Sequence, residues 1–277
     1  MQNSFHYQSD EYDRQSQRFV IPLYLKDELE NFHFSSTGTL AKYQNHHYIL
    51  FAAHALSTEE DFQKIHMMLA NGEFLPIHDL SIGHKVFEKE DVVIVDCFNR
   101  RLDSKNYFDL EQKSLLGFDK RHFTWIGFPA SLSKIKKIGK TITPAALVNR
   151  YFHSDSTGAY LTSAEYYKIT SKLITNNAIE ITGKYSRKNA SLKYKGTVST
   201  AYHPKGMSGG AMFFFTKNQI LKPSLEDTFR FAGIGLEYLK DETIRGVPAR
   251  RIVELLDEFD LANPLQFHLS EDTHQPS

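Results

Sequence analysis

Short apolar runs separated by turn-forming residues make up most of the chain from Phe19 onward. The runs are rich in Val, Ile, Phe and Tyr, and Gly, Asn, Asp and Ser stand between them. Such runs are typical of β-strands, because branched and aromatic side chains pack well on a pleated surface. The clearest are FVIPLYL, GTLAKY, HHYILFAA, VVIVDCF, FTWIGF, AMFFF and FRFAGIGLEY. The pattern predicts an all-β fold.

Two stretches repeat their apolar residues at the helical period instead. The first contains Ser57 and Glu60, which are spaced as a capping box, and it ends at Asn71-Gly72. The second starts near Pro248, a residue that suits a first helical position. Its apolar side chains share one face: Ile252, Leu255, Leu256 and Phe259. We expect that face to pack on the β core, and a partner-binding surface is the alternative.

Polarity divides the chain into four segments. Residues 1–17 are polar and predict a flexible arm or a loosely docked lead-in, and residues 263–277 form a polar tail. Residues 18–125 and 126–262 hold the predicted strands in two units, the second of which includes the C-terminal helix. Two units fit a length of 277 residues. The mixed segment 131–195 predicts no definite element.

The composition excludes several classes of protein. With 33 basic and 33 acidic side chains, a net charge of zero gives no global reason to expect nucleic acid or an anionic membrane as a partner. Cys97 is the single cysteine, so neither an intrachain disulfide nor a thiolate zinc cluster can form. No apolar run approaches the roughly 18 residues of a membrane span, and the polar N-terminus lacks the apolar core of a signal peptide. We therefore expect a cytoplasmic protein.

Two further features have ordinary explanations. Several histidines fall in the first half of the chain without HExxH spacing, so we expect no metal and no cofactor. They are His46, His47, His66, His78 and His84. The segment from Lys134 to Lys140 is basic but short and alternating, which favours a solvated strand edge over a nucleic-acid site.

Ser208 lies in a glycine-rich segment that suits a nucleophile. A nucleophilic serine needs an exposed hydroxyl on a bent backbone and N–H groups directed at the oxygen that becomes negative during attack. Gly206 lets the chain turn its own N–H inward beside that of Ser208, and the glycines at 209 and 210 let neighbours come close. A simple tight turn is the alternative explanation. The following run, AMFFF, predicts a buried strand that holds the segment.

A serine hydroxyl needs a base, and His54 is the best candidate. It closes the apolar run from Tyr48 to Ala53, so the imidazole stands at a strand end, where its pKa can lie near neutrality. A carboxylate must then fix the tautomer of the ring. Asp91 begins a buried run and is the favoured partner; Asp96, inside that run, is the rival candidate.

Four segments now occur in a recognisable order. They are Thr37-Gly38-Thr39-Leu40, Phe51-Ala52-Ala53-His54, Asp91-Val92-Val93-Ile94 and Gly206-Met207-Ser208-Gly209-Gly210. In these motifs and in the order His, Asp, Ser, the chain resembles the trypsin-like (chymotrypsin-fold) serine peptidases. It is most similar to the bacterial HtrA-like branch, without a PDZ domain. The resemblance spans roughly Phe19 to Phe259, with clear matches only in these short motifs.

The resemblance implies a fold and a set of roles. The fold would be two six-stranded antiparallel β-barrels, with a short helix after the catalytic His and a C-terminal helix. The first barrel would carry His54 as general base and acid and Asp91 as its orienting partner. The second would carry Ser208 as nucleophile, with the N–H groups of Gly206 and Ser208 as the oxyanion hole. The implied activity is a serine endopeptidase that acts on a protein or peptide through an acyl-enzyme.

The chain also departs from the family pattern. Met207 stands where secreted, zymogen-activated members have an Asp, and Ala211 stands where the family usually has Pro. Activation by N-terminal cleavage is therefore not expected, and control would come from loop ordering or an activating partner.

Substrate preference is left open by the sequence. By resemblance, the segment from Tyr202 to Lys205 and the strand Gly233-Ile234-Gly235-Leu236-Glu237 would wall the primary specificity pocket. Ile234 and Leu236 favour an apolar or small side chain, whereas Glu237 would attract a basic one.

Two rival functions remain. One is a catalytically idle member of the fold that binds peptides or acts as a scaffold. The other is an esterase or another acyl-transfer enzyme that uses the same three residues.

Overall fold

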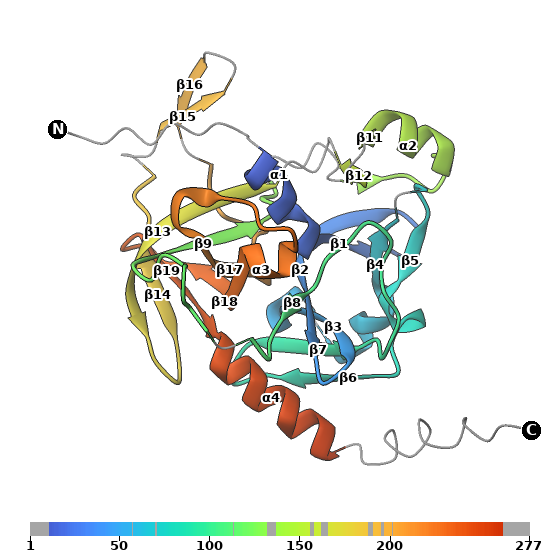
Figure 1. Ribbon diagram of the computed structural model, residues 1–277. Coiled ribbons are helices and arrows are strands. Elements are labelled where there is room, and N and C mark those ends of the chain that lie inside the picture. Colours follow the sequence, from blue (N-terminus) through green and yellow to red (C-terminus); the bar gives the residue numbers. More distant parts are fainter. Residues whose placement is uncertain are drawn as a thin grey trace, which may run out of the picture.

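The computed structural model describes residues 11–56, 58–69, 71–112, 114–131, 137–155, 158–161, 166–187, 191–194, 197–200 and 202–262 (Figure 1). Strands predominate and form one large curled sheet, one closed barrel and two separate hairpins. The predicted all-β character of the chain is confirmed. Apart from the short strand β10 (Lys137–Ile138), the two large β units follow one another in sequence.

The first large sheet contains nine strands and curls on itself. Its main path runs β5-β4-β1-β2-β3-β7-β6, while β8 and β10 pair with β2 outside that path. The strands on the path are β1 (Val20–Lys26), β2 (Phe32–Tyr43), β3 (His46–Ala52), β4 (Ile65–Met68), β5 (Phe74–Pro76), β6 (Gly83–Phe87) and β7 (Val92–Asp96), and β8 is Phe108–Asp109.

This first unit differs from the closed six-stranded barrel that the resemblance implies. Within the residues described, the end strands β5 and β6 do not pair with each other, so the sheet is a curled half-barrel. Strand β5 is three residues long and ends at Pro76, which has no N–H with which to extend a ladder.

The second unit is a closed antiparallel barrel of six strands, as expected. The order around it is β13-β14-β19-β18-β17-β9, and β9 pairs with both β17 and β13 to close the circle. Its strands are β9 (His122–Gly127), β13 (Tyr167–Asn176), β14 (Ile181–Lys184), β17 (Gly210–Phe215), β18 (Phe229–Tyr238) and β19 (Thr243–Pro248).

The segment that the sequence left unassigned divides between the two units. Strand β10 (Lys137–Ile138) pairs with β2 and so joins the first sheet, although it lies in the sequence range expected for the second unit. Helix α2 (Pro144–Tyr151) leads into the hairpin of β11 (Phe152–Asp155) and β12 (Gly158–Leu161). A second hairpin joins β15 (Ser191–Tyr194) and β16 (Thr197–Thr200).

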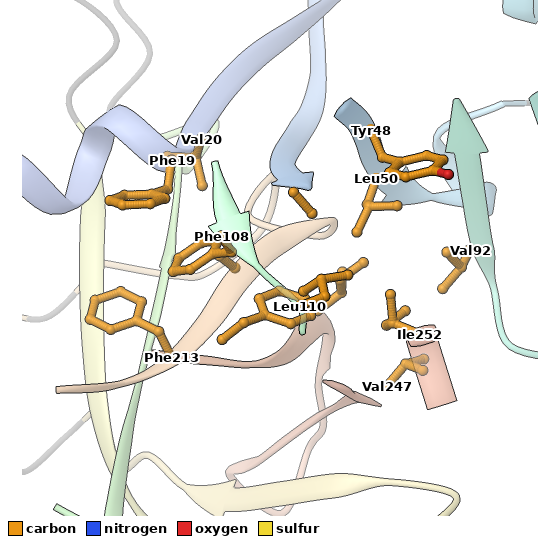
Figure 2. Close-up of a cluster of buried hydrophobic side chains, with 14 of the residues drawn as sticks. Phe19, Val20, Tyr48, Leu50, Val92, Phe108, Leu110, Phe213, Val247 and Ile252 are labelled. Atoms are coloured by element: carbon orange, nitrogen blue, oxygen red, sulfur yellow. The ribbon is translucent and has the colours of Figure 1, made fainter. Parts of the chain in front are cut away.

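One hydrophobic cluster joins the two units. Leu50 and Val92 reach it from the first sheet, and Phe213 and Val247 reach it from the barrel, where Figure 2 shows them converging. Separate clusters fill the interior of each unit. Because burial of apolar area stabilises by roughly 25 cal/mol per Å², this shared cluster holds the sheet and the barrel against each other.

Helix α4 (Ala249–Ala262) packs on this shared core, below both units in the view of Figure 1. Every member of the predicted stripe is at most 1% exposed: Ile252, Leu255, Leu256 and Phe259. The packing interpretation of that stripe is therefore confirmed. Pro248 ends β19, and the helix begins at the next residue.

The polar lead-in is docked over the part that the structure describes. Helix α1 (Glu11–Ser16) is followed by a 3-10 turn (Gln17–Phe19). Tyr12 is 4% exposed, and its hydroxyl accepts a hydrogen bond from the Thr216 amide at 3.1 Å. Of the two alternatives for residues 1–17, residues 11–17 follow the docked lead-in, because a buried aromatic ring fixes this segment to the barrel. Residues 1–10 lie outside the described residues.

The helix expected after His54 is mostly replaced by other structure. A 3-10 helix covers Glu59–Lys64, capped by Thr58 and Asp61, one residue beyond the predicted pair. The predicted cap Ser57 lies outside the described residues. From Ile65 the chain becomes strand β4, because it pairs with β1 at Leu23 to Leu25. Sheet pairing therefore overrides the helical spacing of the apolar residues.

Candidate active site

His54 lies just beyond the end of a central strand of the first sheet. Strand β3 lies between β2 and β7 and ends at Ala52, opposite Val92. A short 3-10 turn, Ala53–Ala55, then carries the imidazole out of the core. The Ala53 amide donates to the Asp91 carbonyl at 3.0 Å, so the turn after β3 is fixed to the residue before β7.

Asp91 meets His54 with both carboxylate oxygens. Its Oδ1 accepts the His54 backbone N–H at 2.8 Å, and its Oδ2 lies 2.6 Å from Nδ1 of the ring. Asp91 has φ 57° at the turn before β7, a left-handed conformation that Asp tolerates better than most residues. With Nδ1–H held by the carboxylate, the neutral ring presents an unprotonated Nε2.

The turn that carries Asp91 is itself held by helix α4. Arg251 on that helix forms an ion pair with Glu90 at 2.8 Å, and both side chains are largely buried. Because Glu90 directly precedes Asp91, the helix that packs on the shared core also restrains the carboxylate.

The electrostatics of this pair favour the protonated ring. The hydrogen bond to Asp91 raises the pKa of His54 above its ordinary value; partial burial opposes this, and the negative charges of Asp91 and Glu237 reinforce it. Half of the His54 side-chain surface remains open to solvent. The imidazole is thus both oriented and accessible.

The Ser208 segment belongs to the barrel but is fastened to the first sheet. The Thr37 hydroxyl donates to the Gly206 carbonyl at 3.1 Å, and the Thr37 amide donates to the Ser208 carbonyl at 3.1 Å. The Thr39 hydroxyl donates to the Gly209 carbonyl at 2.7 Å. Both threonines lie on β2, next to the strand that ends before His54.

Gly209 brings this segment against the end of β3. Its φ is +82°, and an added Cβ would overlap with the Thr37 carbonyl oxygen. The same Cβ would lie 2.9 Å from the Ala52 nitrogen and 3.0 Å from the Phe51 Cα. The absence of a side chain at 209 therefore lets Ser208 approach the strand end from which His54 emerges.

The Ser208 hydroxyl donates to the Leu236 carbonyl at 2.8 Å. Within the described part of the chain it makes no hydrogen bond to His54. Glu237, the next residue along β18, lies close enough to raise the pKa of His54. The structure thus brings His54, Asp91 and the Ser208 segment to one region, with the serine hydroxyl turned to a backbone carbonyl.

Two amides in the Ser208 segment have no acceptor among the described residues. They belong to Gly206 and Ser208, whereas the amides of Met207, Gly209 and Gly210 all donate to backbone carbonyls. Gly206 has φ +95°, a conformation that glycine adopts without steric cost. Backbone amides that are free of fold-maintaining bonds are suited to binding an anionic oxygen.

The residues expected to contact a substrate have different surroundings. Ile234 is fully buried and Leu236 is 8% exposed, both in the cluster between sheet and barrel. A Cβ on Gly235 would overlap with the Trp125 indole. These side chains therefore serve the core, and the Leu236 main chain alone faces the Ser208 hydroxyl. Tyr202 is half-buried, with its ring edge-on to Tyr167 at 5.7 Å.

Asp96, the rival carboxylate, pairs with a different histidine. It is fully buried, and its carboxylate lies 2.9 Å from His46 Nδ1 and accepts the Phe98 amide at 2.7 Å. Because His46 and His54 stand at opposite ends of β3, the choice of Asp91 over Asp96 as the partner of His54 agrees with the geometry.

Sequence reasoning overlooked three contributors. Thr37 was noted only as part of a motif, Glu237 only as a specificity residue, and Arg251 not at all. The sequence does contain a signal for Thr37. It is a polar residue on the buried face of β2, and a buried polar side chain must find hydrogen-bond partners. Its hydroxyl also accepts the Phe128 amide at 3.0 Å.

Two features are absent from the part of the chain that the structure describes. No group of three or more His, Cys, Asp and Glu side chains is arranged to hold a metal ion. Nor does any helix in these ranges have the length and apolar character needed to cross a membrane.

Comparison with known proteins adds no identification. No family model matches the chain. No curated protein matches its sequence either. The assignment of a function therefore rests on the geometry around His54, Asp91 and Ser208.

Proposed function

We propose that the protein is a serine endopeptidase that hydrolyses peptide bonds through an acyl-enzyme. The observation that carries the proposal is the two-point hold of Asp91 on His54, 2.6 Å at Nδ1 and 2.8 Å at the backbone amide. A carboxylate that fixes both ring and backbone serves a base that must keep one orientation.

In this mechanism Nε2 of His54 takes the proton of the Ser208 hydroxyl as its oxygen attacks the carbonyl carbon of the substrate. The Oγ–carbon bond forms, and the carbonyl oxygen becomes an oxyanion that the Gly206 and Ser208 amides bind. The imidazolium then gives its proton to the leaving amine as the carbon–nitrogen bond breaks. A water molecule, deprotonated by His54, releases the acid and restores the serine.

Ser208 must first leave the Leu236 carbonyl, because in the structure its hydroxyl donates there and not to His54. A rotation about χ1 is sufficient to redirect a serine hydroxyl, and staggered rotamers exchange readily when the side chain is partly exposed. Binding of a substrate that pairs with the end of β18 would trigger this rotation of the Ser208 hydroxyl.

The same observation favours a second candidate, a catalytically idle protein that binds peptides. In that case the hydroxyl would stay with Leu236, and the free amides would bind a ligand carbonyl without subsequent chemistry. All three residues of the proposed machinery are present, which favours the enzyme.

A fluorophosphonate probe tests the proposal, since it labels a serine only when that serine is activated. We expect labelling of the wild type and none of Ser208→Ala or His54→Ala. Ser114→Ala, at an exposed position away from the site, is the matched control and should label normally. Absence of labelling in a folded wild type would favour the idle protein. Hydrolysis of esters but of no peptide would favour the esterase alternative.

A further inference from the structure

Basic side chains lie on the surface beside Ser208. Lys205 and His203 belong to the segment that leads into the nucleophile, and both are exposed. The Lys205 carbonyl accepts the Ala130 amide at 2.7 Å, and the Met207 amide donates to the Pro204 carbonyl at 2.8 Å. These bonds fix the segment, so the Lys205 and His203 side chains project from a defined backbone.

The opposite side of this surface is the end of β18. Leu236 accepts the Ser208 hydroxyl, and two residues later the Tyr238 ring stands edge-on to the His203 ring at 5.6 Å. The Tyr238 hydroxyl donates to the Tyr185 carbonyl at 3.0 Å and receives a backbone hydrogen bond from Arg187. The His203 ring and the Arg187 backbone therefore contact the same tyrosine from two different segments.

The acidic groups nearby are already engaged. Glu237 forms an ion pair with Arg245 at 2.8 Å, and Asp241 forms one with Lys184 at 3.0 Å. Glu242 accepts a hydrogen bond from the Ser186 hydroxyl at 3.1 Å. Lys205, by contrast, has no ion pair in the described ranges, and His203 uses only Nδ1, which accepts the Lys205 amide at 3.1 Å.

The titration behaviour of His203 agrees with a basic environment. Burial lowers its pKa first, and the positive charges of Arg187 and Lys205 lower it further. The two positive charges that disfavour protonation of His203 would favour a negative charge bound at the same place.

We propose that Arg187, His203 and Lys205 form a basic subsite beside Ser208 that binds the carboxylate of an Asp or Glu side chain in a peptide. Arg187 and Lys205 supply its positive charge, and the His203 ring supplies a hydrogen-bond donor. The proposal rests on the proposed function for the role of Ser208, and it replaces the apolar or basic preference expected from Ile234, Leu236 and Glu237. Two of those side chains lie in the core, and the third is paired with Arg245.

Binding to the inactive Ser208→Ala protein tests the subsite without requiring catalysis. Two labelled peptides that differ only by Glu or Gln at one position are titrated by fluorescence anisotropy. We expect the Glu peptide to bind about tenfold more tightly or better, because hydrogen bonds to a charged group exceed those to a neutral one. Lys205→Met and Arg187→Met, added singly, should each reduce the ratio.

Lys120→Met is the matched control, since Lys120 is an exposed lysine with no ion pair among the described residues. It should leave the ratio unchanged. The Glu peptide should bind more tightly as the pH falls through the lowered pKa of His203, because the ring then becomes positive. Adding His203→Gln should remove this pH dependence of the affinity. Equal affinities for the two peptides, no binding of either, or a ratio unaffected by all three subsite variants would overturn the proposal.

Failure of the subsite can be told from failure of the proposed function. If the wild-type protein labels with the fluorophosphonate and cleaves Glu and Gln peptides equally, the proposed function is supported and the basic subsite is overturned. If the wild-type protein does not label but Ser208→Ala prefers the Glu peptide, the proposed function is overturned and the basic subsite is supported.

Discussion

Asp91 holds His54 at two atoms, one on the ring and one on the backbone, from a turn that belongs to the neighbouring strand. The two residues are 37 positions apart in sequence, yet β3 and β7 pair in a register that places Ala52 opposite Val92. Orientation of the imidazole is therefore a direct consequence of strand pairing in the first sheet.

Asp91→Asn should lower kcat/KM by a factor on the order of 10⁴ while the protein stays folded, because an amide favours the wrong tautomer and does not stabilise the imidazolium. Kinetics on a peptide substrate, with circular dichroism as a folding check, would measure this. Asp103→Asn, at an exposed position, is the control and should leave kcat/KM unchanged. Retention of most activity in Asp91→Asn would contradict the role given to this carboxylate.

Activity should rise with pH, since His54 accepts a proton only when neutral. The hydrogen bond to Asp91 raises the pKa of His54, so the midpoint should lie above about 6.5, the ordinary value. Glu237→Gln removes one of the charges that raise this pKa and should move the midpoint down by less than about one pH unit. Glu28→Gln, remote and exposed, should not move it. A profile that is flat between pH 5 and 9 would exclude His54 as the base.

The sequence allowed prediction of those parts of the site that depend on local pattern. An apolar run ending at His54, a run beginning at Asp91 and a serine between glycines are visible one segment at a time. The apolar face of α4 follows from periodicity in the same way, whereas the closed barrel was expected only from the resemblance to the trypsin-like peptidases.

Features that depend on contacts between distant segments were not predictable. Ile65 and Leu69 have helical spacing, but pairing with β1 makes this region a strand. Ile234 and Leu236 were expected to meet a substrate, and burial between sheet and barrel accounts for their apolar character instead. The hydroxyl of Thr37 acts on segments about 90 and 170 positions away, a relation that no local pattern records.

Gly209→Ala should destabilise the protein by about 2–5 kcal/mol, which combines the cost of a positive φ with overpacking against β2 and β3. Gly117→Ala separates the two effects, because Gly117 has nearly the same φ, +84°, and nothing within 4 Å of its added Cβ. That variant should lose only about 1–2 kcal/mol. Urea denaturation measures both, and equal losses would show that close approach to the first sheet is unimportant.

The buried pair of His46 and Asp96 should make stability depend on pH in a defined direction. The hydrogen bond to Asp96 raises the pKa of His46, so the folded protein holds this proton more tightly than the unfolded chain. The stabilisation is complete below about pH 6.5 and is lost as the pH rises through the raised pKa. Burial also raises the pKa of Asp260 on α4, whose charge lies near His46 and Asp96, and this acts in the same direction.

His46→Gln should therefore lower the free energy of unfolding by about 1.5–3 kcal/mol at pH 6 and by clearly less at pH 9. The exposed pair of His78 and Asp79 is the matched control, because surface ion pairs contribute little. His78→Gln should change stability by under about 1 kcal/mol at either pH. A loss for His46→Gln that is the same at both pH values would mean that His46 stabilises the end of β3 by packing, with no contribution from its charge.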